Sequence, residues 1–208
     1  MVVPKNIKLT YFAGKGRAEP TRLAFHIGGV AFQDERVKGE EFAKIKPTLP
    51  LGQLPIITID GTVIAQSLGI LRYAGTLTGL YPNNDPLKAL LVDQIVFSLG
   101  DVTDMLVPTF GIQDLDQRIK ARKEIVENRW PALFKGIEEA LKKHGGKYCV
   151  GDNLTVADLS LYTLVEGLKS GILDGVPKNV VEPYPLMTKF SNQVANHPKV
   201  VEWEKAHQ

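Results

Sequence analysis

Few side chains in this sequence have a type and spacing that could do chemistry. The single cysteine, Cys149, lies between Tyr148 and Val150, an apolar context typical of a buried structural thiol rather than a nucleophile. The sequence has no Gly-x-Ser-x-Gly elbow, no dinucleotide-type glycine spacing and no complete P-loop around Gly14-Lys15-Gly16. If the protein is an enzyme, it must therefore activate a group on a molecule that it binds.

Metal and disulfide chemistry are disfavoured. The four histidines lie far apart in sequence: His26, His144, His197 and His207. No two of them have the short spacing of a helical zinc site, so we expect no bound metal ion. One cysteine excludes an internal disulfide and permits a reducing compartment, of which the cytoplasm is the simplest choice.

Composition describes an ordinary globular chain. The 208 residues are 44% apolar and 23% charged, with a net charge of +2. Because Lys and Arg are interspersed with Asp and Glu, we expect neither nucleic acid nor an anionic membrane as a partner. The start has no apolar run of signal-peptide length, and no stretch reaches the roughly 18 apolar residues of a membrane span.

The first 78 residues predict the order strand, helix, strand, helix, strand, strand, helix. The elements before the last helix are expected at 7–12, 18–26, 32–37, 40–46, 54–59 and 62–65. Asp60-Gly61 suits a two-residue hairpin turn, and Ser67 is expected to cap the helix that runs up to Gly79. Pro47 and Pro50 are expected to prevent regular structure around them.

Beyond the turn-rich segment 79–86, helical periodicity replaces the strand pattern. The helices are expected at 87–110, 116–143, 155–170, 186–196 and 199–206. Pro131 should kink the second of them, and Thr155 with Asp158 reads as a reciprocal N-terminal cap with a structural role. The second part of the chain is therefore predicted to be all-helical.

Four short motifs stand in a fixed order: Leu9-Thr-Tyr-Phe12, Gly16-Arg-Ala-Glu19, Gly52-Gln-Leu-Pro-Ile56 and Gln66-Ser-Leu-Gly-Ile-Leu-Arg-Tyr73. With them, the sequence resembles the cytosolic glutathione transferases, most of all the sigma class. The resemblance implies a thioredoxin-like βαβαββα domain at 1–79, a linker at 80–85 and an all-helical domain at 86–208. It further implies a homodimer that conjugates glutathione, as co-substrate, to electrophilic and mostly apolar small molecules in detoxification.

Tyr11 and Arg17 are the catalytic residues that the resemblance implies. Taken alone, Tyr11 would be a half-buried strand residue and Arg17 an exposed loop residue. By resemblance, the Tyr11 hydroxyl points at the glutathione sulfur, and Arg17 stabilises the thiolate or the surroundings of Tyr11. A donor aimed at a thiolate favours the charged form and lowers the thiol pKa.

The other glutathione contacts also follow from the resemblance. Gln66 and Ser67 would hold the γ-glutamyl carboxylate at a helix start, a place that also suits a purely structural serine. Leu54 would pair with the cysteinyl part through its backbone beside a cis bond to Pro55, although trans is the commoner state of such a bond. Gln53 would bind next to it.

Three further residues complete the implied glutathione site. Lys46 would face the glycyl carboxylate. Phe42 stands where sigma-class relatives often carry tryptophan, and it can pack but cannot donate a hydrogen bond. Asp101 of a neighbouring chain would approach the γ-glutamyl amine, whereas a lone aspartate on a helix is ordinarily just solvated.

The sequence indicates fewer residues for the pocket of the second, electrophilic substrate. Phe12 and Thr103 are the expected lining of its pocket. Ser160 stands where some prostaglandin-isomerising relatives have tyrosine, which weakens that specific activity. A glutathione-dependent isomerase, a peroxidase, or a non-catalytic crystallin-like or scaffold protein of the same fold remain as alternatives.

Overall fold

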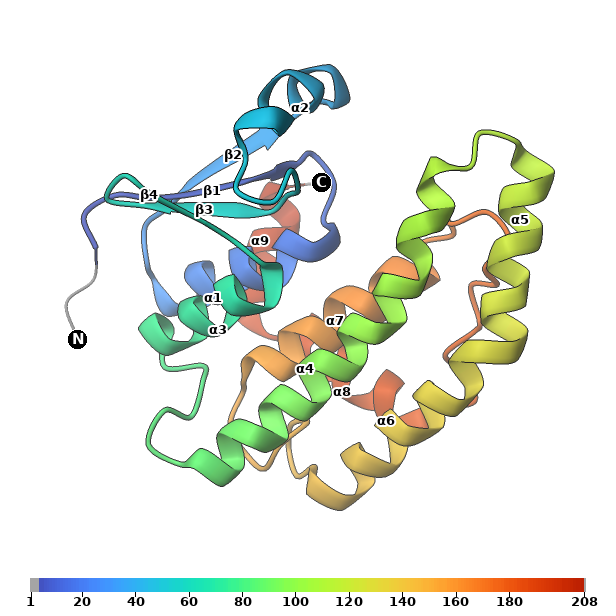
Figure 1. The fold of residues 1–208 in the computed structure, drawn as a ribbon. Coiled ribbons are helices and arrows are strands. Elements are labelled where there is room, and N and C mark those ends of the chain that lie inside the picture. Colours follow the sequence, from blue (N-terminus) through green and yellow to red (C-terminus); the bar gives the residue numbers. More distant parts are fainter. Residues whose placement is uncertain (1–3, 208) are drawn as a thin grey trace. The chain divides into compact units, whose positions relative to one another are not determined.

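The computed structural model describes residues 4–207 and divides into two compact units (Figure 1). The first unit contains the residues up to Asn84 together with those from Pro198 onward, and the second contains Asp85–His197. The sequence predicted a single helical domain from 86 to 208. The structure differs at the C-terminal helix, which packs in the first unit.

The first unit is built on a four-stranded mixed sheet in the order β2-β1-β3-β4. Its elements are β1 (Ile7–Phe12), α1 (Glu19–Gly28), β2 (Gln33–Val37), α2 (Gly39–Ile45), β3 (Ile56–Ile59), β4 (Thr62–Ala65), α3 (Ser67–Thr78) and α9 (Pro198–Ala206). β1 pairs parallel with β2 and antiparallel with β3, and β3 pairs antiparallel with β4. Figure 1 shows α1, α3 and α9 on one side of the sheet and α2 on the other. The predicted order of strands and helices is confirmed.

The core of this unit lies between the sheet and the helices on one side of it. Leu9, Leu23, Phe25 and Ile57 are almost completely buried there. The β3–β4 hairpin turns at Asp60 and Gly61, whose φ angles of 45° and 92° are both positive, as the predicted two-residue turn requires. A short strand pair with a local turn signal is thus well determined by its own sequence.

Two local predictions in this unit were wrong. Gln66, not Ser67, is the N-cap residue of α3, because the chain leaves β4 with a φ of 84° at Gln66 and Ser67 is already helical. Lys46–Thr48 forms a 3-10 turn despite Pro47. A proline is tolerated in the first turn of a helix because its missing N–H would have no intrahelical partner there.

The second unit is all-helical. Its main helices are α4 (Pro86–Leu106), α5 (Leu115–Glu124), α6 (Trp130–His144), α7 (Val156–Lys169) and α8 (Pro185–Ala195). A 3-10 helix, Val107–Gly111, follows α4, where the sequence predicted that the long helix continues. The predicted cap of α7 is confirmed, because Thr155 and Asp158 form a reciprocal capping box.

The predicted single helix at 116–143 is divided into α5 and α6 by a π-helical turn, Ile125–Arg129. Pro131 lies in the first turn of α6 rather than at a kink inside one helix. A proline ring clashes with the carbonyl group four residues earlier and provides no N–H to it. The wider π-helical turn at Ile125–Arg129 makes room for the proline ring and leaves out the hydrogen bond that Pro131 cannot donate.

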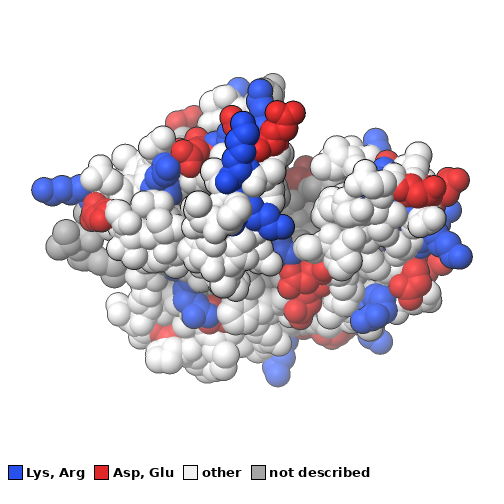
Figure 2. Space-filling model, turned by 45° about the horizontal axis from the view of Figure 1, so that its top comes forward, with Lys and Arg blue, Asp and Glu red and all other residues white. Residues whose placement is uncertain are grey.

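Charges of both signs are mixed on the face that Figure 2 displays. None of the helices in residues 4–207 combines the length and the apolar composition that crossing a membrane requires. Within the same residues, no group of three or more His, Cys, Asp or Glu side chains is arranged to hold a metal ion.

Candidate active site

Tyr11 lies near the end of β1, the strand at the centre of the sheet that pairs with both β2 and β3. Its side chain is half-buried, and its hydroxyl oxygen accepts a hydrogen bond from the backbone N–H of Arg17 at 3.3 Å. A phenol oxygen that accepts this bond still has its own hydrogen to donate. Tyr11 can therefore offer a donor to an acceptor bound beside it.

Gly16 allows this arrangement. Its φ angle is +42°, and a Cβ atom built on it would lie 2.7 Å from the hydroxyl oxygen of Tyr11 and 2.9 Å from Cε1. Any side chain at position 16 would thus collide with the tyrosine ring. The absence of a side chain there lets the Tyr11 hydroxyl approach the backbone of Arg17.

A row of side chains continues from Tyr11. The ring of Phe12 makes edge contacts with the rings of Tyr11, at a centroid distance of 5.3 Å, and of Phe42, at 5.1 Å. The ammonium group of Lys46 lies 5.9 Å from the centre of the Phe42 ring. The structure thus brings together four of the predicted site residues from β1, α2 and the turn after it.

The segment before β3 has the predicted backbone conformation, since the bond between Leu54 and Pro55 is cis. Gln53 is exposed and Leu54 is half-buried. At the start of α3, Gln66 is exposed while Ser67 is only 9% exposed. The first N–H groups of a helix have no intrahelical partner and carry a partial positive charge, which suits a carboxylate.

Asp101 and Thr103 both belong to α4 in the second unit. Asp101 is exposed. The Thr103 hydroxyl donates to the carbonyl oxygen of Gly100 at 2.8 Å, a bond within its own helix. Ser160 makes a similar bond to Val156 at 2.9 Å on α7.

Cys149 has the properties of a structural thiol that the sequence predicted. It is fully buried, and burial raises the pKa of the thiol well above its usual value. Its backbone N–H donates to the Asp158 carboxylate at 2.7 Å. A buried thiol that stays protonated is a poor nucleophile.

Sequence reasoning missed a buried charged network beside Tyr11. Arg22 is fully buried, lies with its guanidinium carbon 5.9 Å from the centre of the Tyr11 ring, and forms ion pairs with Glu19 and Asp34. The spacing of Glu19 and Arg22, three residues apart on one helix face, was the signal that could have indicated it.

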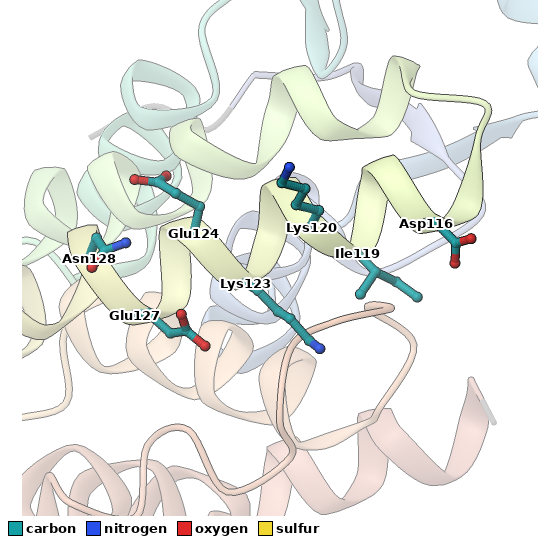
Figure 3. Close-up of a pocket in the computed structure, with 7 residues that line it drawn as sticks. All are labelled: Asp116, Ile119, Lys120, Lys123, Glu124, Glu127 and Asn128. Carbon is teal, nitrogen blue, oxygen red and sulfur yellow. The ribbon is translucent and has the colours of Figure 1, made fainter.

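A depression of about 430 Å³ runs along α5 and the π-helical turn (Figure 3). It is lined by Asp116, Ile119, Lys120, Lys123, Glu124, Glu127 and Asn128. These side chains come from consecutive turns of one helical stretch and project to different sides of it (Figure 3). Small-molecule sites instead gather polar groups from several elements in an apolar cleft, so we assign no ligand to this depression.

Comparison with known proteins identifies the family. Residues 7–76 match the family model "Glutathione S-transferase, N-terminal domain" and residues 101–207 match "Glutathione S-transferase, C-terminal domain". Among curated relatives, hematopoietic prostaglandin D synthase of Gallus gallus is 34% identical over 198 residues, 95% of this chain and 94% of that protein. Glutathione S-transferase 1 of Ascaris suum is 34% identical over 200 residues, 94% of each chain.

The solved structures agree. The sigma class glutathione S-transferase of Fasciola hepatica superposes with a TM-score of 0.82 and 27% identity, covering 98% of this chain and 97% of that one. The chain therefore belongs to the glutathione S-transferase family.

Proposed function

We propose that this glutathione transferase ionises the thiol of bound glutathione with the Tyr11 hydroxyl and transfers the thiolate to electrophilic, mostly apolar small molecules. Family membership establishes the enzyme class. The observation that carries the role of Tyr11 is the hydrogen bond that its oxygen accepts from the N–H of Arg17, because this bond leaves the phenol hydrogen for the sulfur. Detoxification in the cytoplasm is the cellular role that we propose for this activity.

One well-placed hydrogen-bond donor can supply most of the free energy needed to ionise the glutathione thiol at neutral pH. A thiol with a pKa of about 8.5 is only a few per cent ionised at neutral pH. Lowering that pKa by about two units makes the thiolate the major form and corresponds to roughly 2.7 kcal/mol. A hydrogen bond to a charged group contributes about 1.5–3 kcal/mol, so Tyr11 can supply most of it.

The first unit holds glutathione in this proposal. The start of α3 with Gln66 and Ser67 binds the γ-glutamyl carboxylate, the backbone of Leu54 with Gln53 binds the cysteinyl part, and Lys46 faces the glycyl carboxylate. Phe42 packs beside Lys46 without a donor of its own. Arg17 supports Tyr11. Phe12 and Thr103 are the lining residues that we propose for the electrophile pocket, and the second unit supplies the dimer contacts.

A glutathione-dependent isomerase is the second candidate. It is favoured by the 34% identity to hematopoietic prostaglandin D synthase of Gallus gallus. The serine at position 160 weakens it, because the Ser160 hydroxyl already donates to a carbonyl of its own helix. Turnover of a prostaglandin endoperoxide, measured beside turnover of a chloronitrobenzene, distinguishes the two activities.

Calorimetric titration with glutathione tests the binding half of the proposal. We expect saturable heat for the wild-type protein and, for Ser67→Ala, a roughly tenfold weaker affinity, since a hydrogen bond to a carboxylate is lost. The pKa of the bound thiol should change by much less than in a Tyr11 variant. Ser170→Ala is the control, because its hydroxyl is exposed at the end of α7 in the second unit. A titration without heat would contradict glutathione binding itself.

The second experiment concerns the homodimer. Leu87, Leu90 and Phe97, with 67%, 63% and 43% of their surface exposed, have Asp101 on the same face of α4 by helical spacing. An exposed apolar stripe of this kind fits a second copy of the chain and would bring Asp101 to the partner's glutathione. The Asp101 carboxylate would then pair with the γ-glutamyl amine.

Asp101→Asn is therefore expected to raise the dissociation constant for glutathione about threefold to tenfold and leave the dimer intact. Analytical ultracentrifugation should find two chains per particle at the concentrations of the binding assay. Asp116→Asn, an exposed carboxylate on α5, serves as the control. A monomer with full activity would contradict the shared site.

A further inference from the structure

Two guanidinium groups hold the loop between Tyr11 and Arg17 by its backbone. Arg22 donates to the carbonyl oxygens of Phe12 at 3.3 Å, Gly14 at 3.0 Å and Lys15 at 3.4 Å. Arg36 donates to the carbonyl oxygen of Ala13 at 3.1 Å. Four consecutive carbonyl groups are thus bound by fixed donors, which determines the path of the loop that leads to the N–H of Arg17.

Arg22 is itself held by two carboxylates. Its Nε donates to Asp34 at 2.9 Å and its Nη1 to Glu19 Oε2 at 3.0 Å. Arg22 and Glu19 are 0% and 2% exposed, so neither can exchange its partner for water. In such surroundings each polar group needs its protein partner, and the loss of one disturbs the others.

The remaining oxygen of Glu19 is bound by the C-terminal helix. The indole N–H of Trp203 on α9 donates to Glu19 Oε1 at 2.7 Å. The Trp203 ring is nearly buried, stacked on His207 at 3.7 Å and packed near His26 at 5.2 Å. Lys15, within the loop, forms an ion pair with Glu204, the next residue of α9.

We propose that Trp203 is a positioning residue for the thiolate site. Its indole N–H fixes the Glu19 carboxylate, Glu19 fixes Arg22, and Arg22 holds the carbonyl groups of the loop that supplies the Arg17 N–H to Tyr11. This inference rests on the proposed role of Tyr11. It assigns to a helix more than 180 residues away in sequence a part in setting the reactivity of the bound sulfur.

Trp203→Phe tests the proposal, because it keeps an aromatic ring at this position but removes the indole N–H, together with part of the buried ring volume. Released from Trp203, Glu19 Oε1 is left without its donor, and the Glu19–Arg22 pair and the loop must adjust. We expect the pKa of the glutathione thiol, read from thiolate absorbance at saturating glutathione, to rise by about 0.5 units or more. At pH 7 the rate at saturating substrates should fall accordingly.

The matched control is Trp130→Phe. Trp130 is also buried and donates its indole N–H to a buried acceptor, the carbonyl oxygen of Val102 at 3.3 Å, but it lies in the second unit. The same substitution there should lower the melting temperature without moving the thiol pKa. Equal pKa shifts in both variants, or no shift in a folded Trp203→Phe, would overturn the proposal.

Glu19→Gln provides the second route if Trp203→Phe does not fold. It removes the charge between Trp203 and Arg22 and should shift the thiol pKa in the same direction; an unchanged pKa would likewise overturn the proposal. Tyr11→Phe, measured in parallel, separates this inference from its premise. A shift in Tyr11→Phe without one in Trp203→Phe and Glu19→Gln rejects only the role of Trp203, and no shift in Tyr11→Phe rejects the premise.

Discussion

Tyr11→Phe is expected to raise the pKa of the bound glutathione thiol by about two units, to near the value of the free thiol at about 8.5. The substitution removes the hydroxyl that accepts from the N–H of Arg17 and that we propose as the donor to the sulfur, and it leaves the ring packed against Phe12. At pH 7 the thiolate fraction should then fall about 25-fold, with the fold and most of the glutathione affinity retained.

The measurement is the thiolate absorbance of the complex followed against pH, with the conjugation rate of a chloronitrobenzene recorded at the same pH values. The alkaline shift of the absorbance and of the rate should coincide. Tyr148→Phe, which removes a phenol from the second unit, should leave both curves in place. An unchanged titration in Tyr11→Phe would assign the donor to another group, for which Arg17 is the first candidate.

Asp158→Ala is expected to lower the free energy of unfolding by about 4 kcal/mol. Asp158 is 1% exposed, and its oxygens accept from the N–H of Cys149 at 2.7 Å and from the N–H and hydroxyl of Thr155 at 2.8 Å each. Burial raises the pKa of this carboxyl even though these hydrogen bonds oppose the shift. Alanine would leave three buried donors without an acceptor and remove the cap of α7.

Chemical denaturation measures this loss, which is a large part of the roughly 5–15 kcal/mol that stabilises a typical protein. Thr163→Ala is the control on the same helix, because the Thr163 hydroxyl bonds only to the carbonyl oxygen of Leu159 in the preceding turn. It should change the stability little. A loss below about 1 kcal/mol for Asp158→Ala would show that water replaces the carboxylate at this cap.

The parts of the fold that were predictable are those that local sequence determines. The Asp60-Gly61 turn and the Thr155–Asp158 cap each depend on two residues no more than three positions apart, and the structure has both. The division of 116–143 into α5 and α6 was not predictable. Pro131 indicates that the helix is interrupted nearby, but it does not determine which turn becomes π-helical. The cap of α3 was misplaced by one residue, since Gln66 adopts a φ that its residue type does not suggest.

In the candidate site, too, the features set by local sequence were predictable and those set by distant contacts were not. The strand pattern placed Tyr11 at the end of β1, but its partner, the N–H of Arg17, depends on the loop path that Arg22 and Arg36 set. The hydrogen bond between Glu19 and Trp203 joins positions 184 residues apart, and neither hydrophobic periodicity nor a local motif can predict such a contact. Long-range polar contacts of this kind require the tertiary structure.

The position of α9 gives the chain an interleaved connectivity. The polypeptide passes from the first unit to the second between Asn84 and Asp85 and returns between His197 and Pro198, so the helical unit is in effect an insertion within the sheet-containing one. A fragment that stops after α3 would therefore lack Trp203 and expose the face of α1 that α9 covers. A fragment intended to bind glutathione by itself should instead include Pro198–Ala206 together with the residues up to Asn84, so that Glu19 keeps its donor.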